Sequence, residues 1–369
     1  MAKILIYGNP NSPLVRQRGL IGQNAGHEII WFSHHQADLE DVTAFSMPSI
    51  ARKNLLARAI LEPFFLLHVL IKQQPDLVHV HFASKGLAAV PLLRFHPLIV
   101  STMGSDIYPD QSYRGIFAPF IKLLLNHADC ITSKSDFMDS ALDNIGDFRT
   151  KLRRITWGID LSRFHPNRAV ESLRNKMHIK ENAFVFFDPR SARPLYNKHI
   201  ILEAFSKFVD QVDTAVLLIS EMGAKKTYLQ QIKDQAHQLD IMDNIRFLGS
   251  IPYQSMPDYY NLANVTISVP SSDGFPQTIY EAFACGSFLI VGDLPQYKGV
   301  IRNQENAKTV HLGNVDDLVR AMVWTYENHS LRDQAIKHNH EYVCGNADSV
   351  KQANLVNHIY NQLLDGSFS

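Results

Sequence analysis

Short runs of β-branched and other apolar residues recur through the first half of the chain, and longer stretches with helical periodicity separate them. Each run has the length of one strand, and each spacer has room for a helix. Neighbouring parallel strands need such crossover segments. The pattern therefore predicts βαβ units and a parallel sheet, with strands at Ile4–Gly8, Glu28–Ser33, Leu77–Phe82, Leu98–Met103 and Cys130–Ser135.

The same alternation restarts after residue 180, although the sequence itself is not repeated. A chain of 369 residues exceeds the size at which one hydrophobic core usually keeps growing. We therefore predict a second α/β domain, with strands at Phe184–Phe187, Val216–Ile219, Ile245–Leu248, Val265–Val269, Phe288–Val291 and Thr309–Leu312.

The segment Thr156–Arg168 separates the two series and contains Gly158, Pro166 and several polar residues, which is typical of a connection. We predict one domain over residues 1–162 and a second over residues 163–346. Residues 347–369 are expected to form a last helix that packs back across the domains, with apolar positions at Val350, Leu355, Ile359 and Leu363. Two doubly wound, Rossmann-like parallel-sheet domains facing across a cleft would each offer a ligand site at the carboxyl ends of their strands.

Composition and charge narrow the classes of function. The chain is 46% hydrophobic, and its 36 basic side chains equal its 36 acidic ones, so no net charge would recruit nucleic acid. The three cysteines are far apart and lack metal-ligand spacing, which favours a reducing compartment and no metal site. The first strand follows Met1 almost directly, without the pattern of a secretory signal, so we expect a cytoplasmic protein.

The most apolar stretch, Ile60–Ile71, contains Glu62, Pro63 and His68 and is shorter than the roughly 18 residues that indicate a membrane span. Two interpretations remain open. The stretch is either a helix buried in the first domain, or a helix that lies on an anionic membrane surface, because basic residues flank it at Arg52, Lys53, Arg58 and Lys72.

The most informative window is PSSDGFPQTIYEAFACG, from Pro270 to Gly286. Its Pro and Gly positions predict a short helix from about Pro276 to Cys285, which presents the amides of Gln277 and Thr278 at its amino end. Such an end attracts phosphate groups without a metal. Glu281, one turn inside, can accept the two hydroxyls of a ribose, and Asp273 can accept hydroxyls of a sugar beyond the phosphates.

A structural interpretation of the same window is also open, in which Asp273 caps the helix and Glu281 is a solvated helix acid. The stretch DGFPQTIYEAFACG, however, resembles the E-x7-E signature of glycosyltransferase family 4, whose members are retaining enzymes with the GT-B fold. Asp273 stands where the family usually has its first Glu, and Pro276 stands where Gly is usual. The resemblance covers most of the chain.

The stretch FFDPRSARPLYNKHIILEAF resembles the family segment that places cations against the donor diphosphate. On that resemblance we assign Arg190 and Arg193 to stabilising the departing diphosphate, and Lys198 as a third cation whose spacing is altered. The alternative for the arginines is an ordinary surface ion pair, and for Lys198 a surface position at a helix start.

In the first domain, PDLVHVHFASKGLAAVPLLRFHPLIVSTMGSDIY also resembles the family. Asp106 follows a strand and is expected to face the cleft and an acceptor hydroxyl, while Met103 replaces a usual His. Gly8, in the loop GNPNSP, would let the backbone approach substrate. His79 and His81 share one strand face, where they are either structural or, for His81, within reach of the cleft.

The resemblance implies a retaining transfer of a sugar from a nucleoside diphosphate donor, a UDP-sugar rather than a GDP-sugar, to an acceptor hydroxyl. It further implies no obligatory metal or other cofactor, and a carbohydrate or lipid-linked sugar acceptor in bacterial surface polysaccharide or oligosaccharide assembly. A peripheral contact with the inner face of the cytoplasmic membrane is a further expectation. Two alternatives stay open: a nucleotide-sugar epimerase of the same fold, and a catalytically silent carbohydrate-binding subunit.

Overall fold

The computed structural model describes residues 1–37, 42–108 and 118–368. The chain divides into two compact units, one of residues Met1–Gly158 together with Val350–Ser369, and one of residues Ile159–Ser349. The division therefore lies before the predicted boundary at residues 162 and 163. The last helix belongs to the first unit.

The first unit is built on a parallel sheet in the order β3-β2-β1-β4-β5-β6-β7. Because β1 pairs with both β2 and β4, the direction in which strands are added reverses between β1 and β4. This is the topological switch point at which doubly wound sheets bind ligands. The strands are β1 (Lys3–Tyr7), β2 (Glu28–Ser33), β3 (Ala44–Ser46), β4 (Leu77–His81), β5 (Leu98–Ser101), β6 (Cys130–Ser133) and β7 (Leu152–Arg154).

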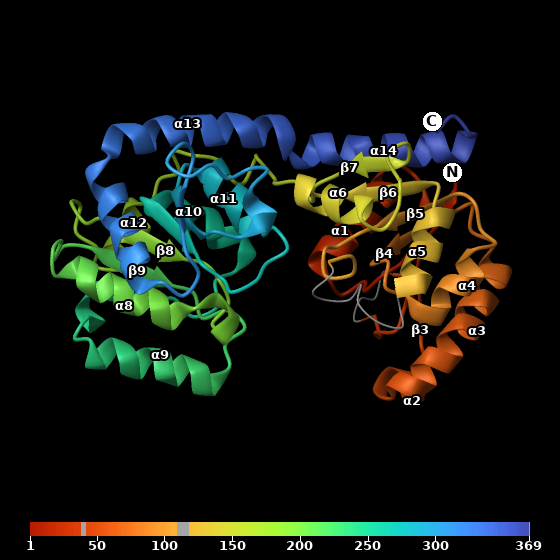
Figure 1. The fold of residues 1–369 in the computed structure, drawn as a ribbon, viewed down its shortest axis with the longest axis horizontal. Coiled ribbons are helices and arrows are strands. Elements are labelled where there is room, and N and C mark those ends of the chain that lie inside the picture. Colours follow the sequence, from red (N-terminus) through yellow and green to blue (C-terminus); the bar gives the residue numbers. More distant parts are fainter. Residues whose placement is uncertain (38–41, 109–117, 369) are drawn as a thin grey trace. The chain divides into compact units, whose positions relative to one another are not determined.

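Helices cover both faces of this sheet, because alternate residues of the inner strands point to opposite sides. In β1, Ile4 and Ile6 pack with the first and last helices, whereas Leu5 and Tyr7 pack with the others. Figure 1 shows the last helix, in dark blue, with its C-terminal end near the N-terminus of the chain. The helices are α1 (Pro13–Asn24), α2 (Ser49–Lys53), α3 (Leu55–Gln73), α4 (Ala89–Leu92), α5 (Ala118–His127), α6 (Asp136–Asp143) and α14 (Ser349–Asp365).

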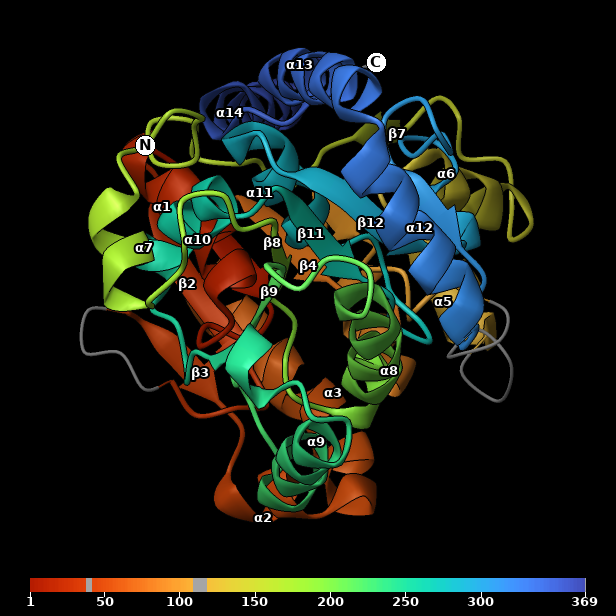
Figure 2. The same ribbon diagram turned by 90° about the vertical axis from the view of Figure 1, so that its left-hand side faces the viewer.

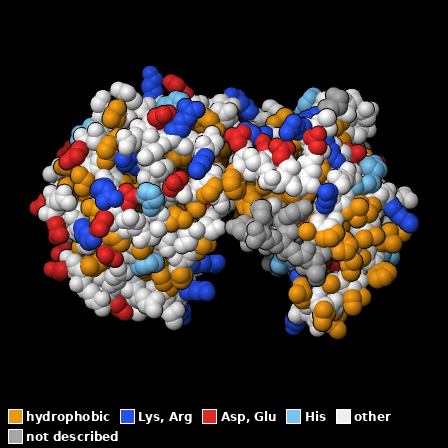
Figure 3. Space-filling view, in the orientation of Figure 1, with side chains coloured by type: hydrophobic (Ala, Val, Ile, Leu, Met, Phe, Trp, Pro, Cys, Tyr) orange, Lys and Arg blue, Asp and Glu red, His pale blue; other side chains and the backbone are white. Residues whose placement is uncertain are grey.

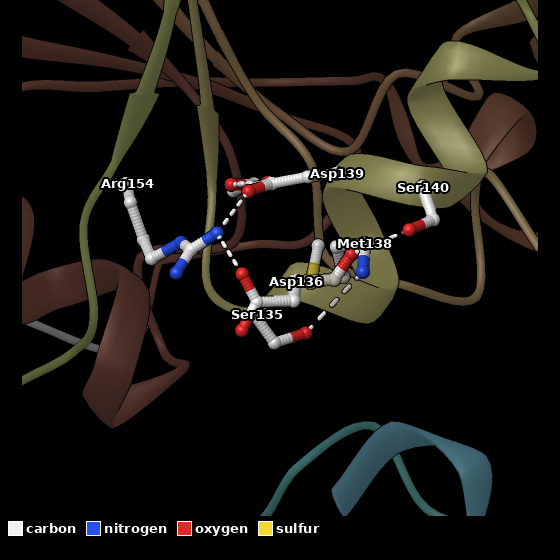
Figure 4. A network of polar contacts seen from close by, with 7 residues as sticks. Ser135, Asp136, Met138, Asp139, Ser140 and Arg154 are labelled. Carbon is white, nitrogen blue, oxygen red and sulfur yellow. Dashed lines mark hydrogen bonds and ion pairs between the residues drawn. The ribbon is translucent and has the colours of Figure 1, made fainter. Parts of the chain in front are cut away.

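A polar network fixes the edge strand β7 to the start of α6 (Figure 4). Ser135 caps this helix by accepting the N–H of Met138, and Asp136 and Asp139 complement the positive end of the helix dipole. The guanidinium of Arg154, at the end of β7, bridges both carboxylates. The charges on the first turn of α6 therefore anchor a strand that is only three residues long.

The second unit has a parallel sheet in the order β10-β9-β8-β11-β12-β13, with the corresponding switch point between β8 and β11. Residues Phe186 and Phe187 of β8 point into different cores on the two faces. The strands are β8 (Val185–Asp188), β9 (Val216–Ile219), β10 (Ile245–Phe247), β11 (Val265–Ser268), β12 (Phe288–Gly292) and β13 (Lys308–Val310).

One face of this second sheet carries α8 and α12, which pack against each other, together with α9 (Figure 2). The other face carries α10 and α11, and α13 packs against α11. The helices are α7 (Glu171–Lys176), α8 (Lys198–Val209), α9 (Lys226–Gln238), α10 (Met256–Leu262), α11 (Gln277–Cys285), α12 (Val315–Glu327) and α13 (His329–Asn346). No helix within the described residues has the length and hydropathy of a membrane span.

Candidate active site

The predicted donor residues of the second unit meet at the switch point of its sheet. Arg190 lies in the loop after β8, and Asp273 lies in the loop between β11 and α11. Because β8 and β11 are hydrogen-bonded neighbours, their following loops emerge side by side at the carboxyl edge. Two residues that are far apart in the sequence are thereby brought into contact.

The contact between Arg190 and Asp273 is a short ion pair. Nη2 of Arg190 lies 2.7 Å from Oδ2 of Asp273, and the two side chains are only 10% and 13% exposed. The guanidinium also lies 4.5 Å from the ring centre of Tyr196, and Asp273 accepts hydrogen bonds from the N–H of Gly274 and the hydroxyl of Tyr297. Asp273 is thus held by the arginine loop and does not cap α11, so the capping interpretation is wrong.

Helix α11 presents its amino end at the same edge of the sheet. The cap position is Pro276, no side chain caps the helix, and Gln277 and Thr278 form the first turn. Phe275, just before it, has a φ of 71°, a left-handed conformation that is costly for a bulky residue, and its ring packs on Tyr280 and Tyr297. The helix start and dipole therefore point into the loop that contains Asp273, which is the arrangement that attracts a phosphate group.

Glu281 is buried rather than solvated, with 6% of its surface exposed. Its Oε2 accepts a hydrogen bond of 2.7 Å from the hydroxyl of the buried Tyr260. Burial raises the pKa of the Glu281 carboxyl, whereas the bond from Tyr260 and the charge of Arg190 lower it. A buried acid that keeps hydrogen-bond capacity beside a helix start suits a bound polyol, and the expectation of a merely surface acid is wrong.

Lys198 differs from both expectations for it. Its side chain is fully buried, and its Nζ lies 2.5 Å from Oδ2 of Asp188 at the end of β8. Burial raises the pKa of Asp188 and lowers that of Lys198, and the ion pair opposes both shifts. Asp188 also accepts the backbone N–H of Arg190, so the pair of Lys198 with Asp188 supports the arginine loop.

Arg193 is exposed, and its Nε donates to the carbonyl of Gly223 at 3.1 Å. Arg190 alone of the two predicted arginines pairs with Asp273.

Several supporting residues were not predicted from the sequence. Asn197, in a left-handed conformation just before α8, donates to the carbonyl of Val269 and to Ser271, and so ties the β11 loop to α8. Tyr260 and Tyr297 were missed because a tyrosine that orients a carboxylate has no sequence signature.

Asp106 in the first unit requires a correction. Its carboxylate is fully buried and accepts the backbone N–H groups of Ala83, Met103 and Gly104 at 2.6, 2.9 and 2.9 Å. It therefore shapes the loops after β4 and β5 and does not face an acceptor hydroxyl. Gly104 has a φ of 108°, and a Cβ there would approach the ring of Tyr108 within 2.9 Å. Only glycine combines this positive φ with the absence of a Cβ.

Gly8 follows β1 at the carboxyl edge of the first sheet, where a Cβ would meet Cγ1 of Val15 at 2.8 Å. The missing side chain therefore serves the packing of α1 against the sheet.

His79 is structural, because its two ring nitrogens lie 2.7 Å from the hydroxyls of Tyr360 and Ser101. Burial, with a contribution from Arg18, lowers the pKa of His79 to about 3. His81 is also fully buried, where it stacks against Trp157.

Sequence comparison places most of the chain in one family. Residues 169–342 match the profile described as Glycosyl transferases group 1, and residues 22–163 match the one described as Glycosyltransferase Family 4. The chain is 27% identical over 170 residues to the alpha-monoglucosyldiacylglycerol synthase of Streptococcus pneumoniae, which covers 44% of this chain and 37% of that synthase. It is 22% identical over 293 residues to the UDP-Gal:alpha-D-GlcNAc-diphosphoundecaprenol alpha-1,3-galactosyltransferase of Escherichia coli, which covers 77% and 75%.

Solved structures give the same picture of the fold. A glycosyltransferase from Rickettsia africae superposes with a TM-score of 0.81 at 17% identity and covers 98% of both chains. Anabaena HepE, in complex with UDP, superposes with a TM-score of 0.80 at 14% identity and covers 98% of this chain and all of HepE. The paired parallel sheets, the acids at positions 273 and 281 and these matches together show that the chain is a member of glycosyltransferase family 4 with the GT-B fold.

Proposed function

We propose that the protein transfers a sugar from a UDP-sugar to a hydroxyl of a carbohydrate or lipid-linked sugar, with retention of the anomeric configuration. The observation that carries this proposal is the site at the β8–β11 switch point. There the start of α11, the ion pair of Arg190 with Asp273 and the buried Glu281 converge. Family membership supplies the reaction class, and UDP-bound HepE, which shares the fold, favours uracil as the base.

The geometry suggests how these residues divide the donor. The diphosphate would lie against the amino end of α11, and the ribose would lie against Glu281 one turn along. Arg190 would then exchange its partner, from the Asp273 carboxylate to the diphosphate, which carries the greater charge. That exchange leaves Asp273 free to accept hydroxyls of the donor sugar.

Catalysis in this proposal depends on the departing diphosphate. Negative charge grows on it as the glycosidic bond breaks, and the guanidinium of Arg190 and the helix amides are already in place to stabilise that charge. A phosphate oxygen of the donor takes the proton of the acceptor hydroxyl on the same face, which retains the configuration. Asp273 orients the sugar and forms no covalent bond, unlike the second carboxylate of a retaining glycosidase.

A scan of nucleotide sugars tests the proposal directly. We expect UDP-sugars to bind in preference to GDP-sugars and to be hydrolysed slowly to UDP and free sugar without an acceptor. Release of UDP, measured with a coupled assay, is the readout, and it should increase when a suitable acceptor is added. An epimerised nucleotide sugar as the product, or binding without any release of UDP, would contradict the transferase function.

We further propose that the acceptor is lipid-linked and that the enzyme works at the inner face of the cytoplasmic membrane. Both relatives named above act on lipid-bearing substrates according to their names. The helices α2 and α3 carry an apolar surface, which forms part of the orange area at the lower right of Figure 3. Its most exposed members, each at least 60% accessible, are Ile50, Leu55, Leu56, Ile60, Phe64 and Ile71.

Charge on α2 and α3 suits an anionic membrane. The two helices carry Arg52, Lys53, Arg58 and Lys72, and their one acid, Glu62, is buried. Basic residues beside exposed apolar side chains are the features of helices that lie in a bilayer interface. Of the two interpretations left open by the sequence, a helix buried in the first domain does not fit, because the outer face of α3 is apolar and accessible.

Replacing Leu56 and Phe64 together with glutamate is expected to lower binding to vesicles that contain anionic phospholipids by more than about tenfold, because two apolar side chains no longer enter the interface. Cosedimentation is the measurement. Leu331→Glu, at an exposed leucine of the second unit, is the matched control and should bind as the unchanged protein does. Equal sedimentation of the double variant would contradict a membrane role for this surface.

A further inference from the structure

The first unit contains a polar cluster at its own switch point, apart from the donor residues. Tyr7 ends β1, and Lys85 lies in the loop after β4, the strand that pairs with β1. Nζ of Lys85 lies 3.8 Å from the centre of the Tyr7 ring, a cation–π contact. Arg58 and Glu62 of α3, one turn apart, and His34, just after β2, complete what we name the edge cluster.

The contacts of Glu62 organise the edge cluster. The hydroxyl of Tyr7 donates to Oε1 of Glu62 at 2.6 Å, and the same oxygen lies 3.8 Å from Nδ1 of His34. Burial, assisted by the nearby charges of His35, Lys85 and Arg58, lowers the pKa of His34 to about 4. The imidazole is therefore neutral near pH 7, and the positive charge of the cluster comes from Arg58 and Lys85.

Within the part of the chain that the structure describes, neither of these two cations has a carboxylate at ion-pair distance, although Glu62 and Asp106 lie near Lys85. Glu62 is already engaged by Tyr7. The carboxylate of the nearby Asp106 already accepts hydrogen bonds from three backbone N–H groups. Burial lowers the pKa of Lys85 to about 8, although Glu62 and Asp106 oppose the shift. Holding a half-buried ammonium without an ion-pair partner costs stability that an anionic ligand would recover.

We propose that the edge cluster binds a phosphate of the acceptor, and that the acceptor is a diphosphate-linked lipid. This inference rests on the transfer reaction proposed above. Doubly wound sheets bind ligands at the switch point, and the donor would occupy the other one, after β8 and β11. Arg58 and Lys85 supply the charge-assisted hydrogen bonds that a phosphate needs.

The position of Arg58 explains why a lipid is favoured over a free phosphate ester. Leu55 precedes Arg58 by one helical turn and Leu61 follows it by one, and both leucines are exposed. The charged group therefore lies at the border of the apolar surface of α2 and α3. A ligand with an anionic head and an apolar tail matches both parts, with the head on the edge cluster and the tail along α3.

The test uses the full chain with saturating UDP, so that the donor site is occupied, and farnesyl diphosphate as the probe. Isothermal titration is expected to show binding that falls about tenfold or more in Lys85→Met and in Arg58→Ala, the loss of one charge-assisted hydrogen bond. Lys337→Met, at an exposed lysine on α13 of the second unit, is the matched control and should leave the affinity unchanged. Farnesol and inorganic pyrophosphate should each bind at least tenfold more weakly than the complete probe.

The pH profile separates a direct contact from a structural role. Lys85 is charged below about pH 8 and loses its charge above that value, so the affinity for farnesyl diphosphate should fall between pH 7 and pH 9. The groups around it are Tyr7, whose pKa burial and Glu62 raise, Arg58, Glu62 and Asp106, together with His34 and His81, whose pKa values burial lowers. Lys85 is therefore the group expected to titrate in this range. In Lys85→Met this fall should disappear.

Three results would overturn the inference: unchanged affinity in both variants, an equal loss in Lys337→Met, or pyrophosphate binding as tightly as the probe. Binding of UDP, measured separately in every variant, distinguishes the two proposals. If UDP binds normally while the diphosphate lipid ignores the edge cluster, this inference fails and the donor assignment stands. If UDP itself does not bind, the proposed function fails.

Discussion

Replacing Arg190 with alanine is expected to lower the rate of sugar transfer by about 10²- to 10³-fold, the usual cost of removing one preorganised group from a developing anion. The reason is that Arg190, in the loop after β8, contacts Ser268, Tyr196 and Asp273, whereas Arg193 does not pair with Asp273. Turnover at saturating donor, measured by release of UDP, is the quantity that should fall. Arg190→Lys should recover only part of the rate, because lysine cannot reproduce the planar fork.

Arg193→Ala is the matched control, since Arg193 lies in the same loop but its side chain donates to the carbonyl of Gly223 and not to Asp273. It is expected to retain most of the activity. Removing Arg190 leaves Asp273 with the N–H of Gly274 and the hydroxyl of Tyr297, so the loop keeps part of its support. A similar loss in both arginine variants would indicate a general effect of charge and would contradict the assignment of Arg190.

Glu281→Ala is expected to weaken the binding of UDP by about 10²-fold, because each hydrogen bond between a charged carboxylate and a hydroxyl contributes about 1.5–3 kcal/mol. Turnover at saturating UDP-sugar should change less, since the ribose lies away from the bond that breaks. Titration calorimetry with UDP measures the first quantity, and the coupled assay measures the second. If Glu281→Ala also weakened the binding of free uracil, which has no ribose, the result would argue against a contact between Glu281 and the ribose.

The control for Glu281 is Tyr260→Phe. That change removes the hydrogen bond at Oε2 but keeps the carboxylate and the shape of the ring. Because the bond lowers the pKa of Glu281, its loss raises that pKa further, and a modest loss of UDP affinity should follow. If Tyr260→Phe were as damaging as Glu281→Ala, the role of Glu281 would be to support the core of α10 and α11.

The fold was predictable where strands are buried on both faces. The inner strands of each sheet are runs of apolar residues with clear ends, and every predicted strand corresponds to an observed one. The strands β3 and β7 were missed, because each is a three-residue edge strand whose side chains are partly exposed. Strand β7 is held by ion pairs of Arg154 with two carboxylates of α6, and no local sequence pattern predicts such a contact.

The donor site was predictable to the extent that motifs resemble those of the family. Arg190 and Asp273 were assigned to the same donor on that resemblance, and the structure brings them into contact because β8 and β11 are neighbours. The sequence could not show that Lys198 turns inward to pair with Asp188, or that the Asp106 carboxylate accepts hydrogen bonds from backbone N–H groups. Both outcomes depend on side-chain direction and loop conformation, such as the positive φ of Gly104, and strand order does not specify them.

The first unit is discontinuous in sequence, and this shapes how the protein is made. Its sheet begins at Lys3, yet Val356, Ile359 and Tyr360 of α14 complete the core on one face. During synthesis the second unit has all of its strands and helices before α14 emerges from the ribosome. The amino-terminal half therefore keeps part of its apolar surface exposed until α14 is made. It completes its core last, although it is translated first.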